Sequence, residues 1–125
     1  MAFVKFTETG RSFSARSSIT PKGMISLNDG SRRKFCLEKF SFAVLYYDSE
    51  KNLVGIELTN DENAEGGIKI RLRTTGADIA AKSFVDFFEI APRVTTMYSI
   101  KNGEQDNWIV LDLNSGKERK VGKDE

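Results

Sequence analysis

The chain has 125 residues, 39% of them hydrophobic and 30% charged, and its formal net charge is +1. This composition predicts one folded domain and argues against long disordered tracts. The single cysteine, Cys36, cannot form an internal disulfide, no apolar run is long enough for a membrane helix, and the first residues lack a signal-peptide layout. We therefore expect a cytoplasmic protein without membrane contact.

The first half of the chain predicts two hairpins with a short helix between them. Alternating apolar and polar residues indicate the first strand, and Pro21-Lys22-Gly23 is typical of the turn that follows it. Asn28 and Asp29 are favourable residues for starting a helix. The expected strands are 13–19, 24–27, 42–47 and 53–59, and the expected helix is 30–35.

The second half repeats this order of elements after an acidic, glycine-rich break at 60–67. Ser83 and Asp86 resemble a capping box, which predicts a helix from there through Phe88. The expected strands are 68–73, 77–81, 95–100 and 108–113. Residues 114–125 are expected to form a mobile charged tail.

The two halves, about 12–59 and 68–113, look like a duplication within a single domain of residues 1–113. A constant offset of 53 residues aligns them without gaps, pairing for example Ile19 with Leu72 and Phe35 with Phe88. The sequence therefore predicts a mostly β domain with two short helices, built from a duplicated β-β-α-β-β unit.

The segment from Gly23 to Leu37 resembles the core of AbrB-like domains of the SpoVT/AbrB and MazE type. The matching positions are filled by Gly23, Ile25, Leu27, Arg32, Phe35 and Leu37. Three positions depart from the pattern: Asn28 stands where a proline is usual, Ser31 replaces an apolar helix residue, and Val85 occupies the arginine position in the second unit. The connections are also longer than usual in the family. The resemblance implies a swapped-hairpin β barrel, which in this family usually forms from two chains, so this chain is expected to be a homodimer or a pseudo-dimeric monomer.

The same resemblance implies DNA binding and a role in transcription regulation. The resemblance implies that the contacts to phosphates or base edges come from Arg16, Lys22, Arg32 and Arg33. Two further alternatives stay open. One is a single-strand-binding protein with curved antiparallel sheets and helices, similar to Whirly and PUR-alpha proteins; the other is a protein-interaction or assembly module whose strand edges pair with another chain.

Basic residues form two groups that could bind the phosphates of a nucleic acid if they converge on one face. One group is Arg32-Arg33-Lys34 on the first helix, and the other is Lys69, Arg71 and Arg73 on one side of a strand. The strand cations could instead protect an edge from aggregation. Tyr46 and Tyr47 lie in an apolar strand, and we expect both to pack in the core.

The sequence favours a binding module over an enzyme. It contains no histidine, and Cys36 beside Leu37 is expected to be a buried, small apolar residue rather than a nucleophile. The acidic residues of 60–67 do not have the spacing of a calcium loop, and no glycine-rich phosphate loop is present. We therefore expect no catalytic residues, no metal and no cofactor.

Overall fold

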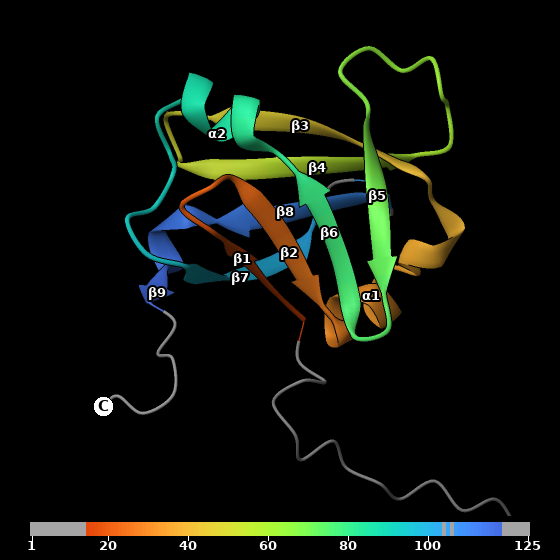
Figure 1. Ribbon diagram of the computed structural model, residues 1–125, viewed down its shortest axis with the longest axis horizontal. Helices are drawn as coiled ribbons and strands as arrows, with labels where there is room; N and C mark the ends of the chain where they lie inside the picture. The colour runs from red at the N-terminus through yellow and green to blue at the C-terminus, as the bar shows by residue number, and fades with distance from the viewer. Residues whose placement is uncertain (1–14, 104, 106, 119–125) are drawn as a thin grey trace, which may run out of the picture.

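The computed structural model describes residues 15–103, 105 and 107–118 (Figure 1). Its strands are β1 (Arg16–Ile19), β2 (Met24–Asn28), β3 (Phe42–Asp48), β4 (Leu53–Thr59), β5 (Ile68–Arg73), β6 (Gly76–Ala80), β7 (Thr96–Asn102), β8 (Trp108–Asp112) and β9 (Lys117–Glu118). Its helices are α1 (Asp29–Lys34) and α2 (Lys82–Phe87), with 3-10 turns η2 (Leu37–Lys39) and η3 (Leu113–Ser115).

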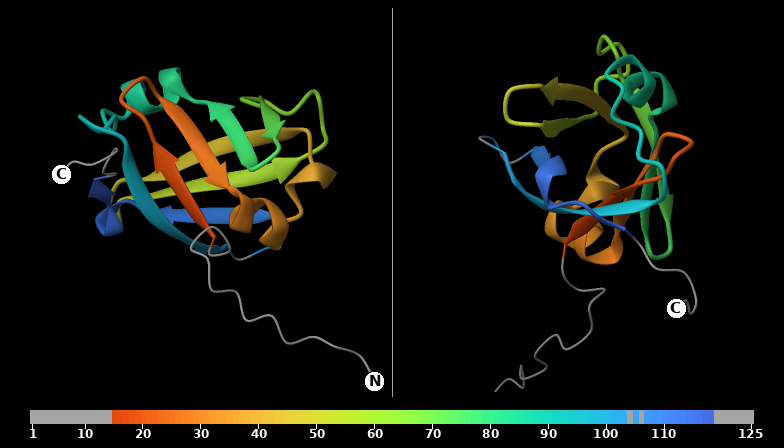
Figure 2. Two further views of the ribbon diagram at one scale, coloured as in Figure 1. Left: turned by 60° about the horizontal axis from the view of Figure 1, so that its bottom comes forward. Right: turned by 90° about the vertical axis from the view of Figure 1, so that its left-hand side faces the viewer.

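Strands β1 to β8 close into an antiparallel barrel. Their order is β1-β2-β6-β5-β3-β4-β8-β7, and β1 pairs with β7 to complete the circle (Figure 2). Closure removes the free sheet edges along the paired strands, which would otherwise be open to other chains. The expectation of a mostly β barrel with two short helices is confirmed.

The four hairpins of the barrel are interleaved. Hairpin β1–β2 lies beside β6–β5, which lies beside β3–β4, which lies beside β8–β7. Each hairpin of the first half therefore has hairpins of the second half on both sides. The strand order is symmetric between the two halves: when each of β1–β4 is replaced by the corresponding strand of β5–β8, and the reverse, the order around the barrel stays the same. The pairing of β1 with β7, for example, corresponds to that of β5 with β3.

The constant offset between the halves holds for the helices and for the second hairpins, where it pairs the buried Ile56 with the buried Ile109, but it is wrong for the first hairpins. It pairs the fully buried Ile19 with Leu72, which is 43% exposed. The reason is that the two turns differ in length, since Ile19 pairs with Ile25 in the first hairpin and Arg73 pairs with Gly76 in the other. A slip of one residue reverses the face that a strand side chain occupies.

Branched aliphatic side chains from both halves fill the barrel interior. Ile25 and Ile79 lie opposite each other on β2 and β6 and are both fully buried, as are Ile56 and Ile109 on β4 and β8. Each such side chain contributes roughly 1.5–3 kcal/mol through its removal from water. The interior is thus a packed core, so sites for other molecules have to lie on the outer surface.

Asn28 starts α1, as the sequence predicts, and also ties the helix to β1. Its side-chain oxygen accepts hydrogen bonds from the backbone N–H groups of Ser31 at 2.9 Å and Arg16 at 3.0 Å. The buried Ser31 hydroxyl in turn donates to the Arg16 carbonyl at 2.7 Å. These bonds hold the basic helix at one end of the barrel.

The capping box expected at Ser83 and Asp86 is wrong. Helix α2 begins at Lys82 after Ala81, and no side chain caps it. The helix begins one residue before Ser83 because the Ala81 N–H donates to the Gly23 carbonyl at 2.8 Å, and this bond fixes where β6 ends. Asp86 instead forms an ion pair with Lys82 at 2.8 Å.

Both helices end in the same way, at a residue with left-handed backbone. Cys36 has φ 52° and Glu89 has φ 56°, although glycine is the usual residue there. Cys36 is exposed, so the expectation that it is a buried apolar residue is wrong. The buried neighbour is Leu37, because the left-handed residue turns the chain and sends the next side chain inward.

The expected tail is in part ordered. Residues 113–115 form η3, and β9 pairs with β7 through Thr96 and Met97. Residues 119–125, the rest of the expected tail, lie outside the described residues, as do residues 13 and 14 of the expected first strand.

Candidate nucleic-acid interface

The basic group of the first helix meets the Arg73 end of the basic strand at one end of the barrel. In Figure 1, α1 lies next to the turn between β5 and β6. The Arg32 guanidinium donates from α1 to the carbonyl oxygen of Arg73, and its distance to the Thr74 carbonyl is 3.4 Å. Because this bond spans the gap between helix and strand, it joins the helical cations to those of β5.

We define the α1–β5 surface by the six basic residues of α1 and β5, where the contact joins α1 to the Arg73 end of the strand and Lys69 lies at the strand's other end: Arg32, Arg33, Lys34, Lys69, Arg71 and Arg73. All are exposed except Arg32, which is half-buried. Two of them form ion pairs with carboxylates. Asp29 pairs with Arg33 at 3.1 Å, and Asp78 pairs with Arg73 at 2.9 Å. Cations therefore outnumber carboxylates, and the surface suits an anionic ligand with several charges.

The ion pairs also fix the geometry of the β5 end. Asp78 lies opposite Arg71 in the β5–β6 register and accepts a hydrogen bond from Ser26 at 2.9 Å. It thereby holds the Arg73 guanidinium against the sheet. Pairing of this exposed kind contributes little to stability, about 0–1 kcal/mol, so a phosphate can compete for the arginine.

Strand β5 has a second physical reason to carry cations. Its register pairs with β3 are those of Ile68 and Lys69, and the Ile70 N–H still donates to the Ser41 carbonyl at 2.9 Å, so the edge is open toward β3 only from Arg71 on. Lysine and arginine on such an edge discourage pairing with other chains. The cations of the strand therefore serve edge protection as well as any ligand.

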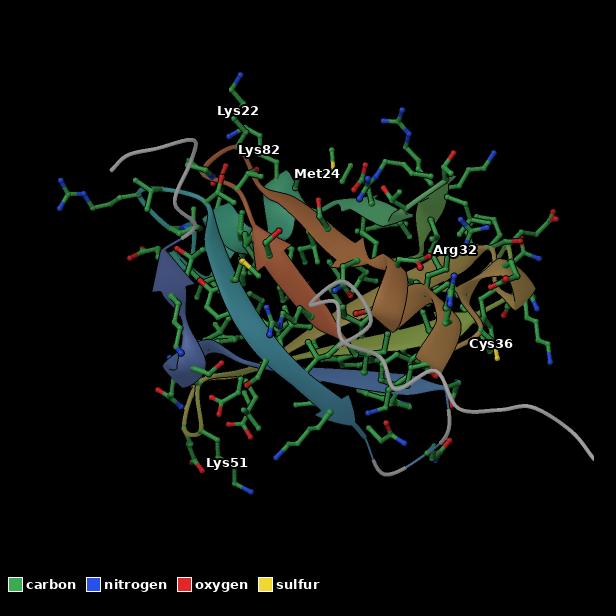
Figure 3. The ribbon with its side chains drawn as sticks, turned by 90° about the horizontal axis from the view of Figure 1, so that it is seen from below. Lys22, Met24, Arg32, Cys36, Lys51 and Lys82 are labelled. Atoms are coloured by element: carbon green, nitrogen blue, oxygen red, sulfur yellow. The ribbon has the colours of Figure 1, made fainter. Side chains whose placement is uncertain are left out.

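The residues implied by the family resemblance do not all converge. Lys22 lies at the turn between β1 and β2, at the other end of the barrel, where Figure 3 shows it beside Lys82 and away from Arg32. Arg16 lies half-buried at the start of β1, close to α1 through the bonds to Asn28 and Ser31. Of the four implied contacts, Lys22 is thus separate, because the hairpin tip and the helix point to opposite ends.

The corresponding end of the second half has a different chemistry. At the helix position of Arg32, α2 has the fully buried Val85, and Phe87 of α2 is 78% exposed. The rings of Phe84 and Phe87 lie 5.2 Å and 4.9 Å from that of Phe88. The exposed side of α1 is therefore cationic and that of α2 is aromatic, despite the symmetric strand order.

The expectation that Tyr46 packs in the core is wrong. Tyr47 packs against the core, but Tyr46 is 44% exposed, because neighbouring residues of a strand face opposite sides. Its phenol donates to Glu57 at 2.7 Å, and this bond, with smaller effects of burial and of the Glu57 charge, raises the pKa of Tyr46. The alternation of Ala43, Leu45 and Tyr47 is the signal that could have placed Tyr46 outside.

Other kinds of site find little support in the part of the chain that the structure describes. It contains no group of three or more Cys, Asp or Glu residues able to hold a metal ion. None of its helices has the length and apolar character needed to span a bilayer. Comparison with known proteins finds no family model, no curated protein and no solved structure that matches this chain. The protein is therefore a closed barrel of interleaved hairpins with a cationic surface at one end.

Proposed function

We propose that this protein is a non-catalytic nucleic-acid-binding module that contacts phosphates through the α1–β5 surface. The contact of Arg32 with the Arg73 carbonyl carries this proposal, because it makes one surface from two basic groups far apart in the sequence. Cations that neutralise phosphates release condensed counterions, and this release drives binding at low salt.

Duplex DNA is the ligand that fits this surface best. Single-strand binding needs aromatic rings on which bases can stack. In the residues that the structure describes, the exposed aromatic side chains are Tyr46 on β3, Phe87 at the end of α2 and Phe88 directly after it, none of them on α1 or β5. A surface with cations but without stacking platforms reads phosphate positions rather than unstacked bases.

The interleaved hairpins support the resemblance to AbrB-like domains, whose swapped-hairpin barrel has this arrangement between two chains. On this proposal the two halves of one chain replace the two chains, and the role is transcription regulation. Two residues differ from what the resemblance implies: Lys22 lies away from α1, and the buried Val85 replaces the arginine of the second unit. Contacts of the family's kind would therefore come from one end of the barrel only.

Fluorescence anisotropy of a short labelled duplex at low ionic strength tests the proposal. We expect saturable binding that weakens about tenfold in Arg32→Glu, which reverses a charge where the two groups meet. The matched control is Lys22→Glu, the same change in charge at the other end, which should bind like the wild type. Absence of binding by the wild type, or tighter binding of single strands than of duplex, would reject it.

A further inference from the structure

A groove on the outer surface of β3, β4 and β8 has no role in the function proposed above. Its volume is about 400 Å³, and its lining includes Tyr46, Asp48, Leu53, Gly55, Trp108 and Val110. This volume is within the range of ligand pockets, roughly 300–1,000 Å³. The groove is separate from the α1–β5 surface, since β3 and β5 pair only at Phe42 and Ala43.

Two aromatic rings form the wall of this groove. The ring centroids of Tyr46 and Trp108 are 4.7 Å apart with an interplanar angle of 32°. Trp108 lies over Gly55, where an added Cβ would approach the indole Cζ3 to 2.9 Å. The glycine therefore lets the indole lie close to the strand, and the Tyr46 ring is held in place by its bond to Glu57.

The charges around the rings are mostly negative. The register places the carboxylates of Asp48, Glu57 and Asp112 on the groove side of the strands and the ammonium of Lys101 opposite Val110, while Glu50 and Lys51 belong to the turn between β3 and β4. The Asp48 carboxylate is fixed by the backbone N–H groups of Glu50 and Lys51, at 3.0 Å and 3.1 Å. Phosphates are repelled by such a rim, whereas a cation is attracted by the carboxylates and by the ring faces.

We propose that this groove binds an arginine or lysine side chain of a basic segment of a partner protein. The aromatic wall supplies cation–π contact and cover for the aliphatic part of the side chain. Glu57 and Asp48 supply the opposite charge, and Glu57 also orients Tyr46. The proposal is independent of nucleic-acid binding, because none of its residues belongs to the α1–β5 surface.

Trp108 is the single tryptophan of the chain, so its fluorescence reports on the groove directly. The probe is acetylated hexa-arginine amide, with hexaglutamate and oligothymidine as matched probes of other chemistry. We expect a saturable change in fluorescence with hexa-arginine only. Its affinity should fall about fivefold or more in Tyr46→Ala and Glu57→Gln, and should fall less in Tyr46→Phe, which keeps the ring and the Glu57 charge but loses the bond between them.

The matched control is Glu62→Gln, which removes an exposed carboxylate in the loop between β4 and β5, outside the residues that line the groove, and should leave hexa-arginine binding unchanged. Lys69→Ala with Arg71→Ala should also leave it unchanged while weakening duplex binding, which keeps the two proposals distinguishable. Three outcomes would overturn the groove proposal: no saturable change, equal weakening by Glu62→Gln, or a response to oligothymidine instead. Analytical sedimentation without peptide tests whether a second copy of this chain occupies the groove. Concentration-dependent self-association that Tyr46→Ala abolishes would also overturn the groove proposal.

Discussion

Arg32 and Arg73, residues 41 positions apart in the sequence, meet through a hydrogen bond from the guanidinium of one to the backbone carbonyl of the other. The bond leaves the Arg73 side chain to its own partner, Asp78, at 2.9 Å. One arginine thus binds backbone while the other is held by a carboxylate. Both guanidiniums are therefore set in position at the same end of the barrel before any ligand arrives.

Removal of the Asn28 side chain should destabilise the protein. Its oxygen caps α1 and accepts the Arg16 N–H, so Asn28→Ala leaves donors without their partner and should cost about 2 kcal/mol. Urea denaturation measures this. Ser83→Ala is the control, because the structure places the start of α2 at Ala81 and gives it no side-chain cap. Equal loss in both variants would contradict this account of the helix starts.

Gly76 is required by both backbone angle and space. It has φ 153°, and an added Cβ would collide with the Leu27 carbonyl oxygen on the neighbouring strand. Gly76→Ala should therefore lower the free energy of unfolding by more than about 2 kcal/mol. Gly66→Ala separates the two causes: Gly66 has φ 78° but its nearest contact is Val44 at 3.9 Å, so about 1 kcal/mol is expected. Equal effects in thermal denaturation would contradict the collision.

Glycine should stabilise both helix ends. Cys36 and Glu89 have left-handed backbone that glycine adopts without steric cost, so Cys36→Gly and Glu89→Gly should each raise stability by about 0.5–1 kcal/mol. The control is Ser83→Gly inside α2, where glycine should destabilise by about 1 kcal/mol. Destabilisation by both end variants would show that the left-handed conformation is wrong.

Two tyrosines should ionise above their ordinary range. The bond to Glu57 raises the pKa of Tyr46, and burial raises that of Tyr98 against an opposing effect of Thr96. Because the folded protein holds these protons more tightly than the unfolded chain, their contribution to stability is present below about pH 10 and is lost as the pH rises through the folded pKa values. Ultraviolet titration of phenolate in wild type and Glu57→Gln measures this, and an unchanged titration curve in the variant would contradict the Tyr46 assignment.

Local patterns predicted most of the barrel strands. The alternation of Ile68, Ile70 and Leu72 placed β5, and Asn28 placed the start of α1. Local chemistry misled at Ser83, because the start of α2 depends on Gly23 in a distant turn. Conformations of single residues, such as the left-handed Cys36, had no sequence signal.

The candidate surface was only half predictable. Residue type identified the cations of α1 and β5, but their meeting depends on the closure of the barrel, which brings β6 between β2 and β5. Lys22 lies at the other end because β2 separates its turn from α1, and the predicted strand 24–27 already implied this separation. The meeting of α1 with β5 had no such local signal, because it follows from pairing between the two halves.

The dependence of duplex affinity on salt tests the central claim most directly. The slope of log K against log salt falls by about 0.9 for each phosphate contact that is removed. We predict that Lys69→Ala with Arg71→Ala lowers the magnitude of this slope by about two, while Lys22→Ala leaves it as in the wild type. An unchanged slope in the double variant, or an equal fall in Lys22→Ala, would contradict a phosphate-binding surface formed by α1 and β5.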